Sequence, residues 1–293
     1  MTGAAGNLRS IYAMLAAVAM FSLMDTAMKL LAAHYPAMQV AALRSLSSLP
    51  LVCAWVAWRG GLRTLLRVRW SLQLLRAGVG IAMLALFAYG LKKLSLAEAY
   101  SIFFIAPALI TALSVFVLKE RVDLARWIAI AVGMGGVLVV LRPEGEGVLT
   151  LGGLAILGSA VCYAISAIGA RVLARSDSSE QIMFWLMLMM AIGASVLAAP
   201  EWVAVEARHG WLLAGLAVSG FFGQLAITEA FSHGQASRVA PFEYSALAWG
   251  VAIDWMLWQA LPDEYTLAGA AIIIGSGLYL IRHEKVHSEA EHP

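Results

Sequence analysis

The chain has 293 residues, of which 61% are apolar and 13% charged, with a mean hydropathy of +0.81. Soluble domains have about 45–50% apolar and about 25% charged residues. Apolar stretches recur from Ile11 to Ile281, so lipid must be the solvent for much of the chain. The net charge of +2 indicates neither a nucleic-acid partner nor an acidic one.

Ten apolar segments of the length that a bilayer requires follow one another along the chain. Open sheets would leave backbone groups unpaired in lipid, so each segment is predicted to be a helix. The first runs on past Asp25 and Lys29, which indicates a retained helix rather than a signal peptide. The predicted spans are residues 8–31, 37–58, 70–90, 96–118, 124–141, 151–173, 179–199, 209–232, 236–260 and 265–282.

The distribution of Lys and Arg predicts the orientation. Thirteen fall in segments on the side of the N-terminus and five on the opposite side. Cytoplasmic segments carry the excess of positive charge, so both termini are predicted to be cytoplasmic. We expect a multi-pass protein of the bacterial cytoplasmic membrane, with residues 284–293 as a loose cytoplasmic tail.

The two halves of the chain resemble each other. Residues 21–32 align with residues 163–174, and residues 131–139 align with residues 272–279, both at an offset of about 141. Five spans in each half is an odd number, so the second half must enter the membrane from the opposite side. Inverted repeats allow a cavity to open alternately to either side. The fold expected is therefore an all-α polytopic membrane protein with ten helices in two inverted five-helix repeats, and the function expected is transport.

Two segments carry a resemblance to a known family. The sequence GQASRVAPFEY at residues 234–244 resembles the signature that opens the ninth helix of EamA-type carriers, in the drug/metabolite transporter superfamily. Its counterpart runs from residue 97 through Pro107 to residue 121, before a glycine-bearing helix that ends at Arg142-Pro143. Within this family the chain is most similar to YddG-type exporters of aromatic and other neutral amino acids.

The resemblance implies repeats at residues 1–143 and 144–283, each EamA-like, and a central cavity lined by the first, third, fourth, sixth, eighth and ninth helices. Family members carry amino acids, other metabolites or cationic drugs. One position departs from the family pattern: Gln259-Ala260 stands where an acidic residue is usual, whereas Glu120 is retained in the first half.

Ionisable residues within the spans are functional candidates, because a charge at the centre of a helix costs about 2.5–3.5 kcal/mol on insertion scales. Asp25 lies four residues before Lys29, close enough for the side chains to meet. Its functional interpretation is that it contacts a substrate ammonium group or takes up a coupling proton. The alternative is a structural ion pair with Lys29. Arg44 either binds a carboxylate or neutralises Asp25 or Glu98.

The ninth segment carries two further acidic residues on one face, Glu243 and Asp254. Glu243 is interpreted either as a gate or proton site or as an ion-pair partner of Arg238. Asp254 is expected to face the outer mouth.

Mixed aromatic, hydroxyl and amide faces on several helices suit a wet cavity for an amphipathic solute. Small and hydroxyl residues also make ordinary contacts between membrane helices, and Trp249 suits contact with lipid, the core or a substrate. The substrate-binding candidates are Asp25, Phe21, Arg44, Tyr100, Phe103, Thr111, Tyr163, Ser166, Gln224, Tyr244 and Trp249, and the coupling or gating candidates are Asp25, Glu243 and Pro107.

We therefore expect a secondary carrier that exports small metabolites, aromatic and other amino acids in particular, by alternating access. The alternative is an exporter of cationic drugs or nucleoside-like compounds. The sequence contains no Walker A, HExxH or GxSxG pattern, so we expect no enzyme activity, no cofactor and no metal. Proton-coupled and downhill transport are both compatible with the residues. Glycines in the last helix of each half suit close packing between halves or protomers, in a monomer or weak homodimer.

Overall fold

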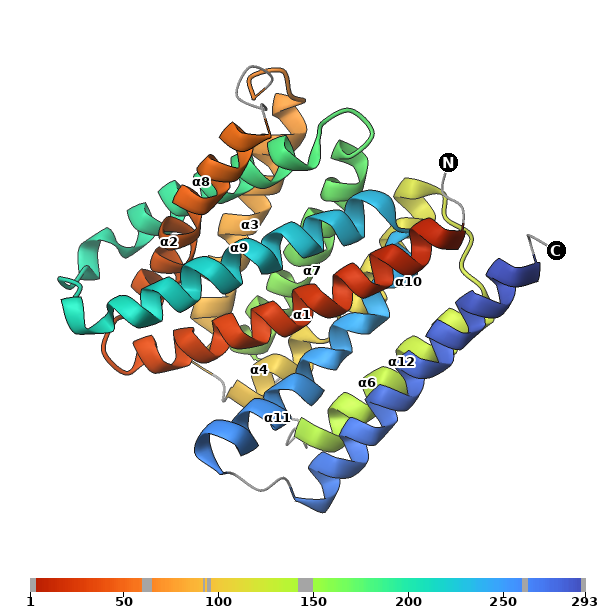
Figure 1. Ribbon diagram of the computed structural model, residues 1–293. Helices are drawn as coiled ribbons and strands as arrows, with labels where there is room; N and C mark the ends of the chain where they lie inside the picture. Colours follow the sequence, from red (N-terminus) through yellow and green to blue (C-terminus); the bar gives the residue numbers. More distant parts are fainter. Residues whose placement is uncertain are drawn as a thin grey trace.

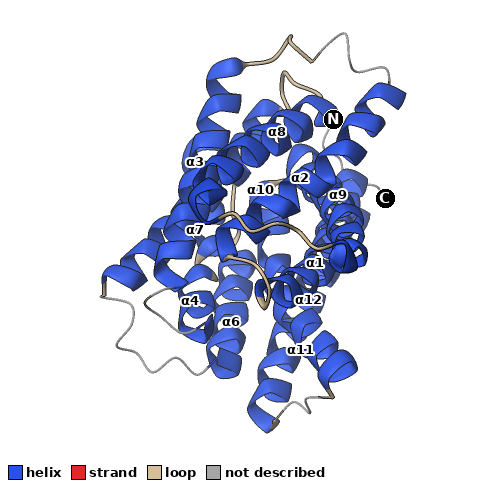
Figure 2. Cartoon of the chain, turned by 90° about the vertical axis from the view of Figure 1, so that its left-hand side faces the viewer, coloured by secondary structure: helices blue, strands red, loops and turns tan. Residues whose placement is uncertain are grey.

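The computed structural model describes residues 4–59, 65–91, 93, 96–141, 150–259 and 263–290. Every regular element within these ranges is a helix (Figures 1 and 2). The longer helices are α1 (Ala4–Ala32), α2 (Ala37–Trp58), α3 (Trp70–Leu91), α6 (Leu124–Leu141), α7 (Leu151–Leu173), α8 (Ser179–Ala198), α9 (Gly210–His233) and α12 (Glu264–Ala290). The prediction of an all-α membrane protein is therefore confirmed.

Six of these helices, α1, α2, α3, α7, α8 and α9, are long and apolar enough to cross a membrane by themselves. Three shorter apolar helical stretches lie at Ala106–Leu118, Leu124–Val139 and Glu264–Leu280. Large apolar side chains remain exposed along the long helices, as expected where lipid rather than water surrounds the protein. The chain is thus a multi-pass membrane protein.

Two expected spans are broken rather than continuous. Residues 96–118 form α4 (Leu96–Phe103), α5 (Ala106–Leu113) and the π-helical segment η2 (Ser114–Leu118). Pro107 stands at the start of α5; it has no N–H to donate to the preceding turn, and its ring crowds that turn. Residues 236–258 form α10 (Ala236–Val239), the 3₁₀ segment η5 (Ala240–Tyr244) and α11 (Ser245–Trp258).

Both broken spans end in the same unusual backbone conformation. Lys119 has a φ of 58° and Gln259 a φ of 51°, and within the described residues these are the two residues other than glycine with positive φ. Left-handed backbone costs a residue with a side chain roughly 1–2 kcal/mol. The positions are 140 apart, close to the offset that relates the two halves of the sequence.

The principal helix pairs join elements from opposite halves of the chain. The closest packing occurs between α1 and α9, α3 and α7, α6 and α12, and α2 and α8. Figure 1 shows α1 along α9 and α6 along α12, the latter pair at the edge of the bundle. The α6–α12 pair approaches closely at a glycine, since a Cβ placed on Gly136 would lie 3.0 Å from the carbonyl oxygen of Gly269.

The two ends of the chain lie on the same side of the bundle in Figure 1. Residues 284–290 of the expected tail belong to α12, which continues as helix to Ala290. The boundary between the predicted repeats, at residues 143 and 144, lies outside the described residues, as do the side chains of Glu98 and Asp254.

Candidate functional site

A cavity of about 110 Å³ lies in the interior between helices of both halves. Its walls come from α1, α2 and α3 in the first half and from α7, α8 and α9 in the second. The fourth and ninth predicted spans, residues 96–118 and 236–260, were expected in this lining, and α2 and α8 stand there instead. Its polar lining side chains are Arg44, Ser45, Arg76, Tyr163, Ser166 and Gln224, and its apolar lining includes Phe21, Met83, Leu186, Met187 and Met190.

Arg44 projects from α2 into this cavity. Its guanidinium carbon lies 5.5 Å from the centre of the Phe21 ring, a cation–π distance. It interacts electrostatically with Asp25 and Tyr163. Among the described residues its guanidinium makes no hydrogen bond and no ion pair within 4.0 Å, so its donors are available to an acceptor inside the cavity. Of the two neutralising partners considered for Arg44, the structure brings Asp25 close.

Arg76 enters the same cavity from α3 and is 6% exposed. Its Nε donates to the carbonyl oxygen of Ser166 at 3.1 Å, and its Nη1 donates to that of Ile182 at 3.3 Å. Carbonyl oxygens carry only a partial charge, so they orient the guanidinium without neutralising it. The position was visible in the sequence as an ionisable residue within a span, but it was not predicted as a site residue.

Tyr163 joins the cavity to a half-buried carboxylate. Its hydroxyl donates to Oε1 of Glu243 at 3.0 Å, and its ring centre lies 5.7 Å from that of Phe103. Arg238, the alternative partner considered for Glu243, donates instead to Oε1 of Gln235 at 2.6 Å. Glu243 is therefore connected to the cavity wall rather than to the basic residue near the start of its own span.

Some of the remaining predicted residues lie in or near the cavity, and others lie away from it. Asp25 is exposed and interacts electrostatically with Arg44 and Tyr100. The Phe87 ring meets Tyr100 in a tilted contact and Phe103 edge-to-face. Among the cavity residues, Gln224 donates to the hydroxyl of Thr228 at 3.3 Å.

Other predicted residues lie away from the cavity. Thr111 and Tyr244 are buried, and their hydroxyls have no hydrogen-bond partner within the described ranges. Tyr244 packs against Val137 of α6 and Ile273 of α12. Pro107 is buried at the start of α5, and Trp249 is 44% exposed on α11.

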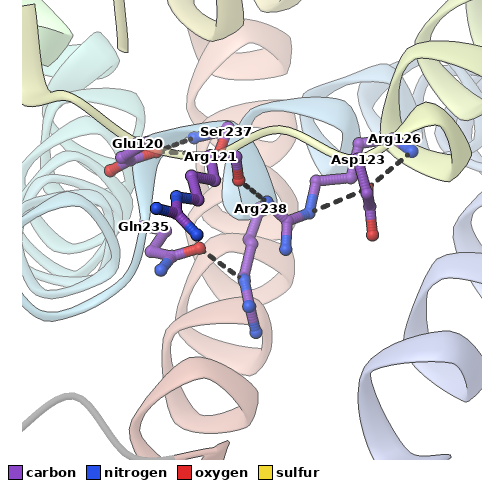
Figure 3. A network of polar contacts seen from close by, with 7 residues as sticks. All are labelled: Glu120, Arg121, Asp123, Arg126, Gln235, Ser237 and Arg238. Atoms are coloured by element: carbon purple, nitrogen blue, oxygen red, sulfur yellow. Dashed lines mark hydrogen bonds and ion pairs between the residues drawn. The ribbon is translucent and has the colours of Figure 1, made fainter. Parts of the chain in front are cut away.

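A second polar contact closes one end of the bundle, where Glu120 meets the start of α10. Its Oε1 accepts from the backbone N–H of Ala236 at 3.0 Å. Its Oε2 accepts from the N–H and the hydroxyl of Ser237 at 3.1 and 2.7 Å. Figure 3 shows the Glu120 carboxylate turned toward Ser237 beside the Gln235–Arg238 contact. A first-half carboxylate thereby satisfies backbone donors that open a second-half helix.

A larger and more open groove of about 430 Å³ lies on the outside, between α1 and α9. Its lining is mostly apolar, and its charged residues include Glu229 and His233, which form a pair at 3.2 Å. Because the smaller cavity gathers groups from both halves around two guanidinium groups, we take it as the candidate site. In the described part of the chain, no three His, Cys, Asp or Glu side chains gather as metal ligands would.

The fold and the sequence have known relatives. One solved crystal structure superposes with a TM-score of 0.82 over 97% of this chain and 98% of that chain, at 18% identity, which shows a common fold. The pseudopaline exporter CntI of Pseudomonas aeruginosa is 26% identical over 90% of this chain and 93% of its own. The riboflavin transporter of Vibrio cholerae is 27% identical over 79% and 78%, and the S-adenosylmethionine uptake transporter of Rickettsia conorii is 27% identical over 92% and 90%.

The sequence profile of the EamA-like transporter family matches twice, at residues 8–142 and 150–282. The resemblance to EamA-type carriers is thus confirmed. The family and the named relatives are transporters and not enzymes. This chain is a small-molecule membrane transporter and belongs to the EamA-like transporter family.

Proposed function

We propose that the chain is a secondary carrier of the bacterial cytoplasmic membrane that exports small metabolites, aromatic and other amino acids in particular, by alternating access. The observation that carries this proposal is the interior cavity, which places a cation–π pair, a tyrosine and an amide between helices of both halves. Aromatic and cationic groups beside one another suit a solute with a ring and a carboxylate.

The proposal includes ten membrane crossings in two inverted repeats, residues 1–143 and 144–283, with both termini in the cytoplasm. The packing supports it, because exchanging the halves converts the α1–α9 pair into α7–α3 and leaves the α2–α8 and α6–α12 pairs unchanged. The broken spans and the left-handed residues Lys119 and Gln259 recur at equivalent places. Such a pseudo-twofold relation is what alternating access uses.

The contact between Glu120 and the start of α10 joins the halves on the side that the Lys and Arg distribution assigns to the cytoplasm. Release of this contact is the expected step that opens the cavity inward. Asp25 and Glu243 are the proposed coupling residues, since Asp25 borders Arg44 and Glu243 holds Tyr163. Pro107 is the proposed hinge of the first broken span.

The substrate class and the coupling to protons are tested together by counterflow of radiolabelled amino acids in proteoliposomes, with and without a pH gradient. We expect accumulation that aromatic and large neutral amino acids compete away. An effect of the gradient that Asp25→Asn abolishes would assign coupling to Asp25, and the same loss in Glu243→Gln alone would assign it to Glu243. Sealed vesicles that exchange no amino acid would contradict the substrate class.

The second candidate is a carrier of nucleoside-like or cationic compounds. The exposed carboxylate of Asp25 beside an aromatic residue favours it, and two relatives are named for riboflavin and S-adenosylmethionine. The same vesicles separate the candidates, because uptake of labelled S-adenosylmethionine or riboflavin without any amino acid exchange would support this second one.

A further inference from the structure

We propose that Arg44 and Arg76 together form a subsite for a carboxylate group of the substrate, with the apolar part of the substrate against the methionine and leucine side chains of α8. This inference rests on the proposed carrier function and narrows its substrates to compounds that carry a carboxylate. It is carried by two guanidinium groups that line one cavity and that no protein carboxylate fully neutralises.

The first step concerns the hydrogen bonds of the two arginines. The guanidinium of Arg44 makes no hydrogen bond to any described residue, although it lines the cavity and lies over the face of Phe21. Arg76 uses Nε and Nη1 for two carbonyl oxygens, and no described residue accepts from its Nη2. Charged donors left without acceptors in a membrane interior are costly, so a ligand that supplies oxygen acceptors there is strongly favoured.

The second step concerns the balance of charge around the cavity. Arg44 interacts electrostatically with Asp25 and Tyr163, and Tyr163 interacts in turn with Arg76 and Glu243. Asp25 offsets the charge of Arg44, whereas Glu243 accepts the hydrogen bond of Tyr163. Arg76 is left with carbonyl partners alone. An anionic group between the arginines supplies the charged partner that Arg76 lacks, and an ammonium group on the same solute would lie toward Asp25.

The third step concerns shape. Guanidinium groups bind carboxylates through two parallel hydrogen bonds, a geometry that ammonium groups do not provide. The backbone carbonyls of Ser166 and Ile182 fix the orientation of Arg76, and the Phe21 ring fixes that of Arg44. In the same cavity, Leu186, Met187 and Met190 of α8 supply an adaptable apolar wall. The cavity is therefore suited to a solute with a carboxylate at one end and an apolar body at the other.

The test compares matched ligands for binding, independently of transport. The purified full-length protein in lipid nanodiscs is titrated with L-phenylalanine and with its amide, and with 3-phenylpropionate and with 3-phenylpropionamide, and its thermal stabilisation gives apparent Kd values. We expect each carboxylate to bind at least about ten-fold tighter than its amide. Equal binding within both pairs, or no stabilisation by either carboxylate up to about 10 mM, would overturn the subsite.

Variants locate the effect. Arg44→Gln and Arg76→Gln are each expected to reduce the preference for carboxylate about ten-fold. Arg44→Lys and Arg76→Lys retain the positive charge and are expected to lose only part of this preference. Arg208→Gln is the matched control, because Arg208 is exposed and pairs with Glu206 outside the cavity. An unchanged preference in the arginine variants would contradict the assignment, and the wild-type ligand pairs decide the question if a variant does not fold.

The outcomes separate this inference from the carrier proposal. Tight binding of carboxylates with no flux in vesicles would leave the subsite and overturn the carrier function that we propose. Flux of amides and amines at the rate of the carboxylates would leave the carrier and overturn the subsite. Tighter binding of phenyl phosphate than of 3-phenylpropionate would assign the two arginines to a phosphate instead.

Discussion

The two broken spans both end in a left-handed residue, but the carboxylate that makes hydrogen bonds to the rest of the protein stands at a different place in each. The first, α4–α5–η2, is followed by Lys119 in left-handed conformation and by Glu120, which binds the opening residues of α10. The second, α10–η5–α11, ends at Gln259 in the same conformation. The next residue there is alanine, and one of the two acidic residues of this span, Glu243, lies in η5 near its start.

The carboxylates of the two spans, Glu120 and Glu243, make different kinds of contact. Glu120 receives two backbone N–H groups and one hydroxyl from the opposite half, so it fixes the two halves against each other at one end. Glu243 receives the hydroxyl of Tyr163 beside the cavity, so it fixes the wall of the site. The two broken spans therefore end in the same backbone conformation but differ in their charged contacts, and this difference is expected to favour the state closed on the Glu120 side.

The largest effect is expected from Glu120→Ala. It leaves the N–H groups of Ala236 and Ser237 without acceptors, and both residues are fully buried. We expect a loss of about 2–4 kcal/mol in the free energy of unfolding, measured by denaturant titration in detergent micelles. Glu206→Ala is the control, since its pair with Arg208 is exposed, and it should change stability by less than about 0.5 kcal/mol. Equal values for the two variants would show that the Glu120 contact does not hold the halves together.

A smaller effect is expected from Tyr163→Phe, which removes one hydrogen bond to Glu243 rather than three. The loss should be about 1–2 kcal/mol, because the carboxylate is left without this donor. Phe is nearly the same size, so packing with Phe103 is retained. A stability loss as large as that of Glu120→Ala would remove the contrast drawn between the two spans.

The smallest effect is expected at the two left-handed positions. Lys119→Gly and Gln259→Gly should each raise stability by up to about 1 kcal/mol, since glycine adopts positive φ without steric cost. Arg121→Gly is the control, because Arg121 has no positive φ and should gain nothing. A gain at one position only would mean that the two halves do not end their broken spans in equivalent ways.

Hydropathy predicted most helix ends correctly, because the cost of burying polar backbone and charge in lipid acts on each segment separately. The predicted spans 37–58, 124–141 and 151–173 coincide with α2, α6 and α7. The positions of the breaks did not follow from the same signal. Pro107 was predicted only as a coupling or gating residue, because where a helix breaks and resumes depends on the packing of its neighbours, and the parallel break at Pro241 was not predicted.

The site was predicted in part. Phe21, Arg44, Tyr163, Ser166 and Gln224 all line the cavity. Arg76 was missed because α3 is apolar around most of its circumference, so the sequence did not indicate which face turns inward. The contact between Glu120 and Ser237 joins residues 117 apart, and no local pattern predicts a contact at that separation.

The crossed helix pairs have a consequence for how the protein is made. Each of α1, α2, α3 and α6 has its main partner in the second half of the chain. Ribosomes add about 5–20 residues each second, so the delay between the synthesis of an early helix and that of its partner ranges from about 4–16 s for α3 to about 10–40 s for α1. During that time the guanidinium groups of Arg44 and Arg76 lack the walls of α7 and α8. Neither half is therefore expected to fold as a separate unit, and we expect a protein truncated after the first half to be degraded by membrane quality control.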